Sequence, residues 1–183
     1  MNMEKAVFQI INNLLSTDFE VTRNVQILGR EIPLLAHSNL SIQQYLFSEK
    51  WVVDEVRTND YLFCWLEDSR LTRQGLDHSI RWLQRYSDFV NSSDHQHMRS
   101  RYIGIIFSTS QTLDPNVQKY LKLCSRSRWL KWGFHGWNEY FLIVFHLPTS
   151  SWMLTRKSRE FKLLLSKIKE QLLKYRYSRR EEE

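Results

Sequence analysis

Basic and aromatic side chains alternate in the segment KYLKLCSRSRWLKWGFHGW, residues 119–137. Lysine and arginine neutralise phosphates, and tryptophan rings stack on bases, so this composition favours binding of nucleic acid. The candidate binding residues are Lys122, Arg126, Arg128, Lys131 and Trp132. The same alternation also fits a strand whose arginines form a solvated outer face. That structural alternative stays open at the level of the sequence.

A loop with two glycines precedes the most apolar run of the chain, EYFLIVFHL. Gly133 and Gly136 allow a bend that a side chain would forbid, so we expect both glycines to be structural. No helix and no lysine follow in the pattern of a phosphate-binding loop, which excludes that motif. His135 and Trp137 form a candidate functional loop, although a structural hydrogen bond is the simpler role for His135.

Acidic residues provide a hydrolytic alternative. The order of expected elements resembles the core of restriction-endonuclease-like nucleases, in which two carboxylates hold a divalent metal ion and an acid-x-Lys motif orients the attacking water. The matching candidates here are Asp54, Glu55 and Glu67. No lysine stands two residues after these acids, so a metal-dependent nuclease or hydrolase would need a degenerate core. We therefore keep it as the second hypothesis.

Metal ligands and nucleophiles are sparse. His95 and His97 alternate and Asp94 precedes them, but zinc sites need three or four ligands, so we expect no metal site and no cofactor. The pair His95 and His97 stays the alternative metal site for a hydrolase. The chain has no G-x-S-x-G motif. Cys64 and Cys124 lie in apolar surroundings far apart in the sequence, and we expect buried free thiols in a reducing cytoplasm.

Length and charge set the organisation of the chain. With 183 residues we expect one domain over 1–177, with a core over about 19–157, a basic helix over 158–177 and a charged tail over 178–183. The net charge is +6, but residues 119–180 hold 15 Lys/Arg against 3 Glu, a local charge of +12. We expect no signal peptide and no transmembrane segment, and hence a cytoplasmic protein.

Hydrophobic periodicity indicates the elements that must position these residues. We expect helices over 4–15, 73–90 after Thr72, 115–124 after Asp114-Pro115, and 158–177. Strands are expected on both sides of 29–31, at 45–47, 51–53 and 61–66 with an Asn59-Asp60 turn, at 101–110 and in EYFLIVFHL. The fold class is α+β (or α/β), with a mixed sheet of about five strands flanked by helices and a C-terminal amphipathic helix.

His97-Met98 before one strand, KWGFHGW before a second apolar strand, and the region of Lys157 beyond it resemble an uncharacterised bacterial and archaeal domain family of unknown function. The resemblance covers about 19–157 and leaves the basic C-terminal helix as an extension. It implies a self-contained α/β domain and no particular substrate. It adds weight to the positions His97, Gly133, His135, Gly136 and Trp137.

Together these patterns favour a non-enzymatic cytoplasmic domain that binds an anionic partner, DNA or RNA, through its basic and aromatic C-terminal third. The metal-dependent nuclease is one alternative. A protein–protein adaptor or homodimer, with a tryptophan-bearing surface, is another. The basic C-terminal helix is expected to dock on the sheet, while a role in binding a partner stays open.

Overall fold

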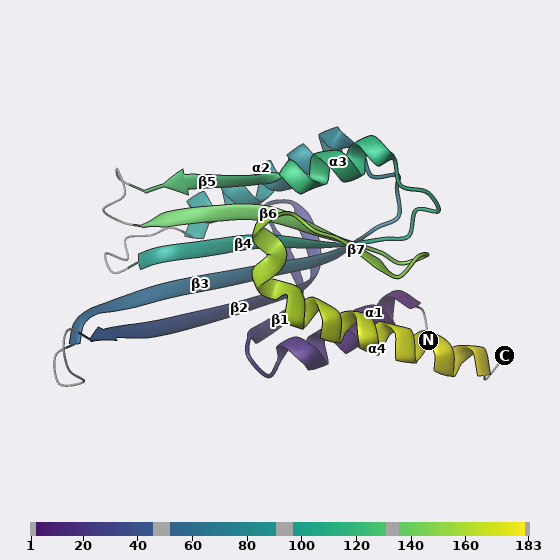
Figure 1. Ribbon diagram of the computed structural model, residues 1–183, viewed down its shortest axis with the longest axis horizontal. Helices are drawn as coiled ribbons and strands as arrows, with labels where there is room; N and C mark the ends of the chain where they lie inside the picture. Colours follow the sequence, from purple (N-terminus) through teal and green to yellow (C-terminus); the bar gives the residue numbers. More distant parts are fainter. Residues whose placement is uncertain (1–2, 46–51, 91–96, 131–135, 182–183) are drawn as a thin grey trace.

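The computed structural model describes residues 3–45, 52–90, 97–130 and 136–181. Figure 1 shows that the strands within these ranges form one sheet with helices on both sides. In chain order the elements are α1 (Met3–Leu15), β1 (Glu20–Ile27), β2 (Arg30–Tyr45), β3 (Val52–Glu67), α2 (Arg73–Val90), β4 (His97–Ser108), α3 (Pro115–Leu123), β5 (Ser125–Trp129), β6 (Trp137–His146), β7 (Ser151–Met153), the 3₁₀ helix η2 (Lys157–Phe161) and α4 (Lys162–Glu181).

The sheet is mixed, with the strand order β1-β2-β3-β4-β6-β5. β1, β2 and β3 form an antiparallel meander, and β4 and β6 run parallel to β3. β5 and β7 both pair antiparallel with β6, β5 along its first half and β7 along its last residues. The predicted α+β class with a mixed sheet flanked by helices is confirmed, and the described residues form a sheet of seven strands where about five were expected.

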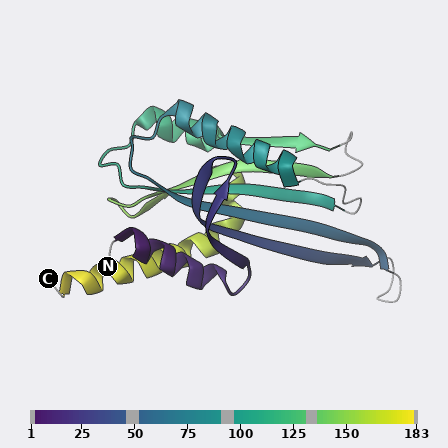
Figure 2. The same cartoon turned by 180° about the vertical axis from the view of Figure 1, so that it is seen from behind.

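Helices cover both faces of the sheet and create two hydrophobic layers. On one face, Ile11 of α1 and Ile168 of α4 are fully buried in the same cluster. On the other face, Leu83 of α2 and Leu121 of α3 belong to a second cluster. Figures 1 and 2 show these two helix pairs on opposite sides of the sheet. α4 therefore docks on the sheet with an apolar stripe, as its periodicity predicted.

Strand β6 runs through the middle of both layers. Phe141, Ile143 and Phe145 belong to the cluster under α1 and α4, whereas Tyr140 and Val144 belong to the cluster under α2 and α3. Side chains alternate between faces along a strand, so the part of a strand that is covered by apolar layers on both sides is apolar at successive positions. The continuous apolar run in the sequence is explained by this location.

Two helix starts follow from capping residues, as predicted. The hydroxyl of Thr72 accepts the backbone N–H of Gly75 at 3.1 Å and so satisfies a free donor in the first turn of α2. The carboxylate of Asp114 accepts the N–H of Asn116 at 2.8 Å, and Pro115 occupies the first position of α3.

Two predicted boundaries are wrong. Asn59 and Asp60 do not form a turn, because β3 runs straight through them and pairs with β2 and β4 on both sides. The buried carboxylate of Asp60 is matched by Arg101 of β4, which lets an acidic residue lie inside the sheet. At the C-terminus, α4 continues to Glu181, so the segment from 178 is helical where a tail was expected.

The β1–β2 hairpin curls from one face of the sheet to the other, as Figure 2 shows. Its two-residue turn, Leu28-Gly29, has positive φ at both positions, the geometry that matches strand twist in tight hairpins. Further back, Asn24 has a φ of 50° opposite Pro33, which has no N–H to complete the ladder. On the two sides of Pro33, Ile32 lies in the cluster under α2 and α3, whereas Leu34 lies in the cluster under α1 and α4.

The two cysteines are free and buried, as predicted. Cys64 lies in the layer under α1 and α4, and Cys124 lies in the opposite layer, so the sheet separates them. Burial raises the pKa of Cys64 strongly and raises the pKa of Cys124 to about 11. Both side chains are therefore protonated apolar residues of the core near neutral pH.

Candidate nucleic-acid interface

The structure brings three of the predicted basic residues together at the end of α3 and along β5. Lys122 is exposed in the last turn of α3. Arg126 and Arg128 are separated by one residue on β5, so they point to the same side of the strand, and their side chains are 48% and 52% exposed. The sequence alternation therefore identified two exposed arginines correctly.

Both arginines reach back to α2. Arg126 forms an ion pair with Asp77 at 3.6 Å, and Arg128 forms one with Asp88. Exposed ion pairs of this kind contribute about 0–1 kcal/mol each, because water screens them. These contacts orient the guanidinium groups without removing them from solvent. A phosphate group that approaches can therefore compete for the same donors.

Trp129 ends β5 as a large exposed aromatic side chain. Its exposed fraction is 67%, and its ring lies 5.6 Å from the ring of Trp137 at an angle of 47°. Contact with Trp137 limits the rotation of Trp129, while most of the Trp129 side chain stays exposed to solvent. Of the other candidates in this segment, Lys131, Trp132, Gly133 and His135 lie outside the described residues.

Gly136, which follows this undescribed segment, has a structural role. Its φ is 75°, a conformation that favours glycine, and its carbonyl accepts the N–H of Leu130 at 3.0 Å. The prediction that this glycine allows a bend before β6 is therefore confirmed. Trp137 is half-buried, and its ring contacts the ring of Trp129.

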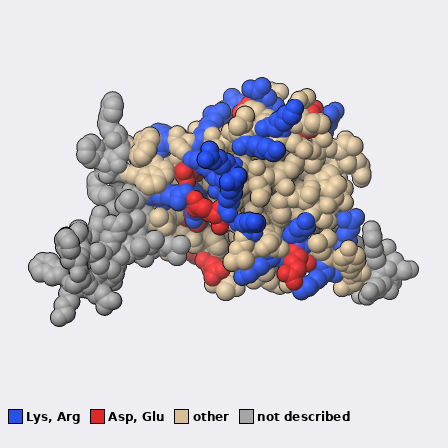
Figure 3. Space-filling model, viewed as in Figure 1, with Lys and Arg blue, Asp and Glu red and all other residues tan. Residues whose placement is uncertain are grey.

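Further basic residues come from η2 and the start of α4, and the sequence did not connect them with β5. The ammonium group of Lys157 donates to Ser127 of β5 at 2.5 Å, which places η2 beside that strand. Arg156, Arg159 and Lys162 are exposed around this contact. Figure 3 shows Lys and Arg side chains gathered over α3 and β5 and over the beginning of α4.

We call this set of residues the β5 surface. Its members are exposed, have a basic or aromatic side chain, and lie at the end of α3, on β5, or in and next to η2: Lys122, Arg126, Arg128, Trp129, Arg156, Arg159 and Lys162. Arg126 and Arg128 point toward α2, whereas Ser127 contacts Lys157 on the α4 side. The β5 surface therefore wraps around both sides of an edge strand.

A cluster of six ionised groups anchors η2 to the sheet beside this surface. Glu139 of β6 accepts hydrogen bonds from Arg99 at 2.6 Å and Lys157 at 2.7 Å. Glu160 of η2 pairs with Arg99 at 3.2 Å and also with Arg101, and Arg101 pairs with Asp60 as well. The members of the cluster are Asp60, Arg99, Arg101, Glu139, Lys157 and Glu160. Three acids face three cations, so the cluster is neutral.

The protonation of Glu139 reflects this environment. Burial acts to raise the pKa of Glu139, but hydrogen bonds from Lys157 and Arg99 outweigh burial and hold the pKa below its usual value. Glu139 is therefore an ionised anchor near neutral pH. This is not the environment of a general acid, which needs a raised pKa.

The acids considered for metal-dependent hydrolysis do not come together. Asp54 and Glu55 lie at the beginning of β3, and Glu67 is its last residue. Glu67 lies twelve positions after Glu55, a separation of roughly 40 Å along a strand at about 3.3 Å per residue. Among the described residues, no group of three or more His, Cys, Asp or Glu side chains could hold a metal ion.

The histidine pair considered as a metal site is only partly within the described chain. His95 lies outside the described residues, and His97 is the first residue of β4. His146, the last residue of β6, has a structural role. Its Nδ1 lies 2.7 Å from the hydroxyl of Thr149 and its Nε2 lies 2.7 Å from the carbonyl of Ser110, so both ring nitrogens are used in structural hydrogen bonds.

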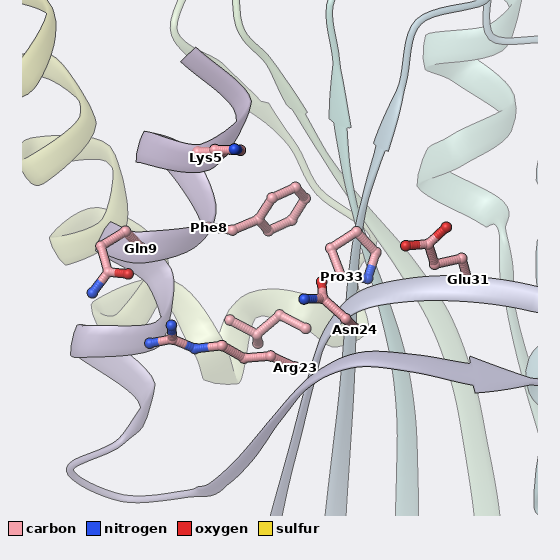
Figure 4. A pocket seen from close by; sticks show the side chains of 8 residues that line it. Lys5, Phe8, Gln9, Arg23, Asn24, Glu31 and Pro33 are labelled. Atoms are coloured by element: carbon pink, nitrogen blue, oxygen red, sulfur yellow. The ribbon is translucent and has the colours of Figure 1, made fainter. Parts of the chain in front are cut away.

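Two hollows in the described surface have the size of small-molecule sites. Figure 4 shows the first, of about 440 Å³, between α1 and the β1–β2 hairpin, where Arg23 and Glu31 lie on opposite sides of the Phe8 ring. The second, of about 570 Å³, lies between α2 and α3 and includes Arg73 and Lys119. Neither was predicted, because each depends on how separate elements pack.

Comparison with known proteins identifies the family of this chain. In the described ranges, none of the helices combines the length and apolar composition that a bilayer crossing requires. No curated protein and no solved structure matches the chain. A family model matches residues 3–167, a wider range than the resemblance over about 19–157 suggested. The chain therefore belongs to the family described as Domain of unknown function (DUF8052).

Proposed function

We propose that this protein is a non-enzymatic cytoplasmic domain that binds nucleic acid through the β5 surface. The observation that carries the proposal is the exposed ring of Trp129 at the end of a strand that also presents Arg126 and Arg128. Arginines neutralise phosphates, and an aromatic ring stacks on a base regardless of its identity. This combination is typical of binding to single strands with little sequence preference.

Charge supports the same proposal. Residues 119–180 carry a local charge of +12, whereas residues 1–118 carry −3 from 11 Lys/Arg and 14 Asp/Glu. The anchoring cluster around Glu139 is neutral, so it does not offset the exposed cations of the β5 surface. Among the described residues, these cations form ion pairs only with Asp77 and Asp88. A basic surface of this kind attracts polyanions at long range.

The test is fluorescence anisotropy with labelled single-stranded and double-stranded DNA and RNA oligonucleotides at several salt concentrations. If four to six cations of the β5 surface contact phosphates, the logarithm of the association constant for a single strand falls with the logarithm of salt concentration with a slope of roughly −3 to −4. Trp129→Ala weakens single-strand binding at least about fivefold, because stacking contributes about 1–3 kcal/mol per base.

Variants of arginine and lysine provide the matched comparison. Arg128→Gln makes the salt slope shallower by about one and weakens binding to all sequences alike. Lys174→Gln changes an exposed cation of α4 whose partner is Glu170, outside the β5 surface, and leaves binding unchanged. No change of anisotropy with any oligonucleotide at low salt rejects the proposal. Equal losses of affinity in Arg128→Gln and Lys174→Gln would also reject the proposal, because binding would then depend on the charge of the protein and not on the β5 surface.

The structure gives less support to the two alternative functions, a nuclease and a protein–protein adaptor. A nuclease that uses Asp54, Glu55 and Glu67 would need acids from opposite ends of β3 at one metal site. A protein–protein adaptor gains some support from Phe89 and Leu123, which are 76% and 80% exposed. Light scattering of the purified protein distinguishes a stable dimer from a monomer that binds oligonucleotides.

A further inference from the structure

The hollow between α2 and α3 combines a cationic rim with an apolar floor. Its volume is about 570 Å³, within the range of small-molecule pockets. Arg70, Arg73 and Lys119 contribute the cations of the rim. Leu71 and Val117, each 6% exposed, contribute apolar surface below them. None of the residues around this hollow belongs to the β5 surface.

The charges around the hollow leave a positive excess. Its acidic residue is Asp114, whose carboxylate already accepts the N–H of Asn116 at 2.8 Å and pairs with Arg70 at 3.5 Å. Arg73 and Lys119 are exposed. Three cations against one engaged carboxylate give a net charge of +2, and the N-terminus of the 18-residue helix α2 adds positive potential at the same place.

Arg73 is held in position by an aromatic neighbour. Its guanidinium carbon lies 4.7 Å from the ring centroid of Tyr120, a cation–π contact. The hydroxyl of Tyr120 in turn donates to Asp77 of α2, which fixes the ring. A guanidinium has five N–H donors, so a contact with one aromatic ring leaves donors that can bind an anion.

The apolar part of the hollow explains why a simple anion would not fill it. Leu123 lies at the rim of the hollow. It is 80% exposed, an unusual exposure for a large apolar side chain at the end of a helix. With Leu71 and Val117 it offers surface for a flat ring. The complementary molecule therefore has an apolar ring at one end and a strongly anionic group at the other.

We propose that the hollow between α2 and α3 binds a phosphate monoester that carries an aromatic ring, such as a nucleoside monophosphate. The phosphate lies against Arg70, Arg73 and Lys119, and the ring covers Leu71, Val117 and Leu123. This site goes beyond the proposed binding of oligonucleotides, because a free mononucleotide occupies it without contact to β5.

The test uses the full chain labelled with ¹⁵N and NMR titrations with adenosine monophosphate, phenyl phosphate, inorganic phosphate and adenosine. We expect both phosphate monoesters to shift amide signals of residues 70–73 and 116–123, and to bind at least about tenfold more tightly than inorganic phosphate or adenosine. No shifts with either monoester up to about 10 mM overturn the proposal. Inorganic phosphate that binds as tightly as the monoesters also overturns it, since the apolar floor would then be unused.

Substitutions locate the site and separate it from the β5 surface. Arg73→Gln and Lys119→Gln each weaken binding of adenosine monophosphate by about tenfold, the effect of losing one charge-assisted contact. Arg85→Gln, an exposed arginine on α2 away from the hollow, leaves it unchanged. Trp129→Ala also leaves it unchanged, whereas a loss in that variant would move the site to β5 and overturn this assignment. Failure of oligonucleotide binding alone affects only the proposed function.

Discussion

Replacing Arg101 with methionine tests whether the buried ion pair with Asp60 holds the middle of the sheet. The side chains of Arg101 and Asp60 are only 14% and 6% exposed, and the two residues lie side by side on β4 and β3. Methionine keeps apolar contact with Phe161, over whose ring the guanidinium carbon lies at 4.7 Å. The substitution therefore removes the charge and hydrogen bonds while it retains much of the packing.

The expected loss of unfolding free energy is about 3 kcal/mol. Removing one partner of a buried ion pair costs about 3–5 kcal/mol, because the remaining charge has no counterion. We take the lower end, since both side chains keep some contact with water. Glu160 also loses Arg101, but it is 53% exposed and keeps Arg99 at 3.2 Å, so its contribution is small. Against a typical total of about 5–15 kcal/mol, this loss is large.

The measurement is urea unfolding at neutral pH, followed by tryptophan fluorescence and far-ultraviolet circular dichroism. Arg128→Met is the matched control. Arg128 also lies on a strand and pairs with an aspartate, Asp88, but both of these side chains are about half exposed. We expect that control to lose about 0–1 kcal/mol.

A double substitution isolates the pair itself. Asp60→Asn together with Arg101→Met leaves no unpaired charge, so it should be less destabilising than the sum of the single changes by about 1–3 kcal/mol. The reasoning fails if Arg101→Met costs no more than Arg128→Met, or if the two single losses simply add. Either outcome would mean that water or another group compensates Asp60.

Two further predictions concern pH and packing. Because hydrogen bonds from Lys157 and Arg99 keep the folded pKa of Glu139 below the unfolded value of about 4.3, its stabilisation is present above that pH and lost as pH falls through the folded pKa. Calorimetry should therefore show that Glu139→Gln lowers the melting temperature at pH 7 and flattens its decline between about pH 5 and 3; parallel curves would contradict this. Gly104→Ala would place a Cβ 2.5 Å from the Trp65 ring, so urea unfolding should show a loss of about 1–3 kcal/mol, and an unchanged midpoint would contradict the packing.

The predictable parts of the fold are those governed by neighbours in the sequence. Thr72 and Asp114 cap α2 and α3 through hydrogen bonds two or three residues away, so local patterns located both helix starts. β6 was predictable because burial on both faces requires an uninterrupted apolar run. In contrast, Asn59 and Asp60 have the composition of a turn, and the group that accommodates Asp60 in β3 is Arg101, 41 residues further along the chain.

The candidate site also has parts that local sequence patterns predict and parts that they do not. Alternation along β5 indicated that Arg126 and Arg128 share an exposed side, and the structure shows that they do. Their partners on α2 and the position of η2 beside Ser127 depend on how distant segments pack, which no local pattern contains. The Arg73–Tyr120 contact between two helices was invisible for the same reason.

The position of β6 between β4 on one side and β5 with β7 on the other has a consequence for aggregation. Its central residues, FLIVF, have high β-propensity and no charge, the composition of segments that stack into amyloid when their edge is open. Only five residues of β5 and three of β7 cover that edge within the described chain. These two short strands are therefore a protective cover over the edge of β6, and a ligand that binds to folded β5 would stabilise that cover.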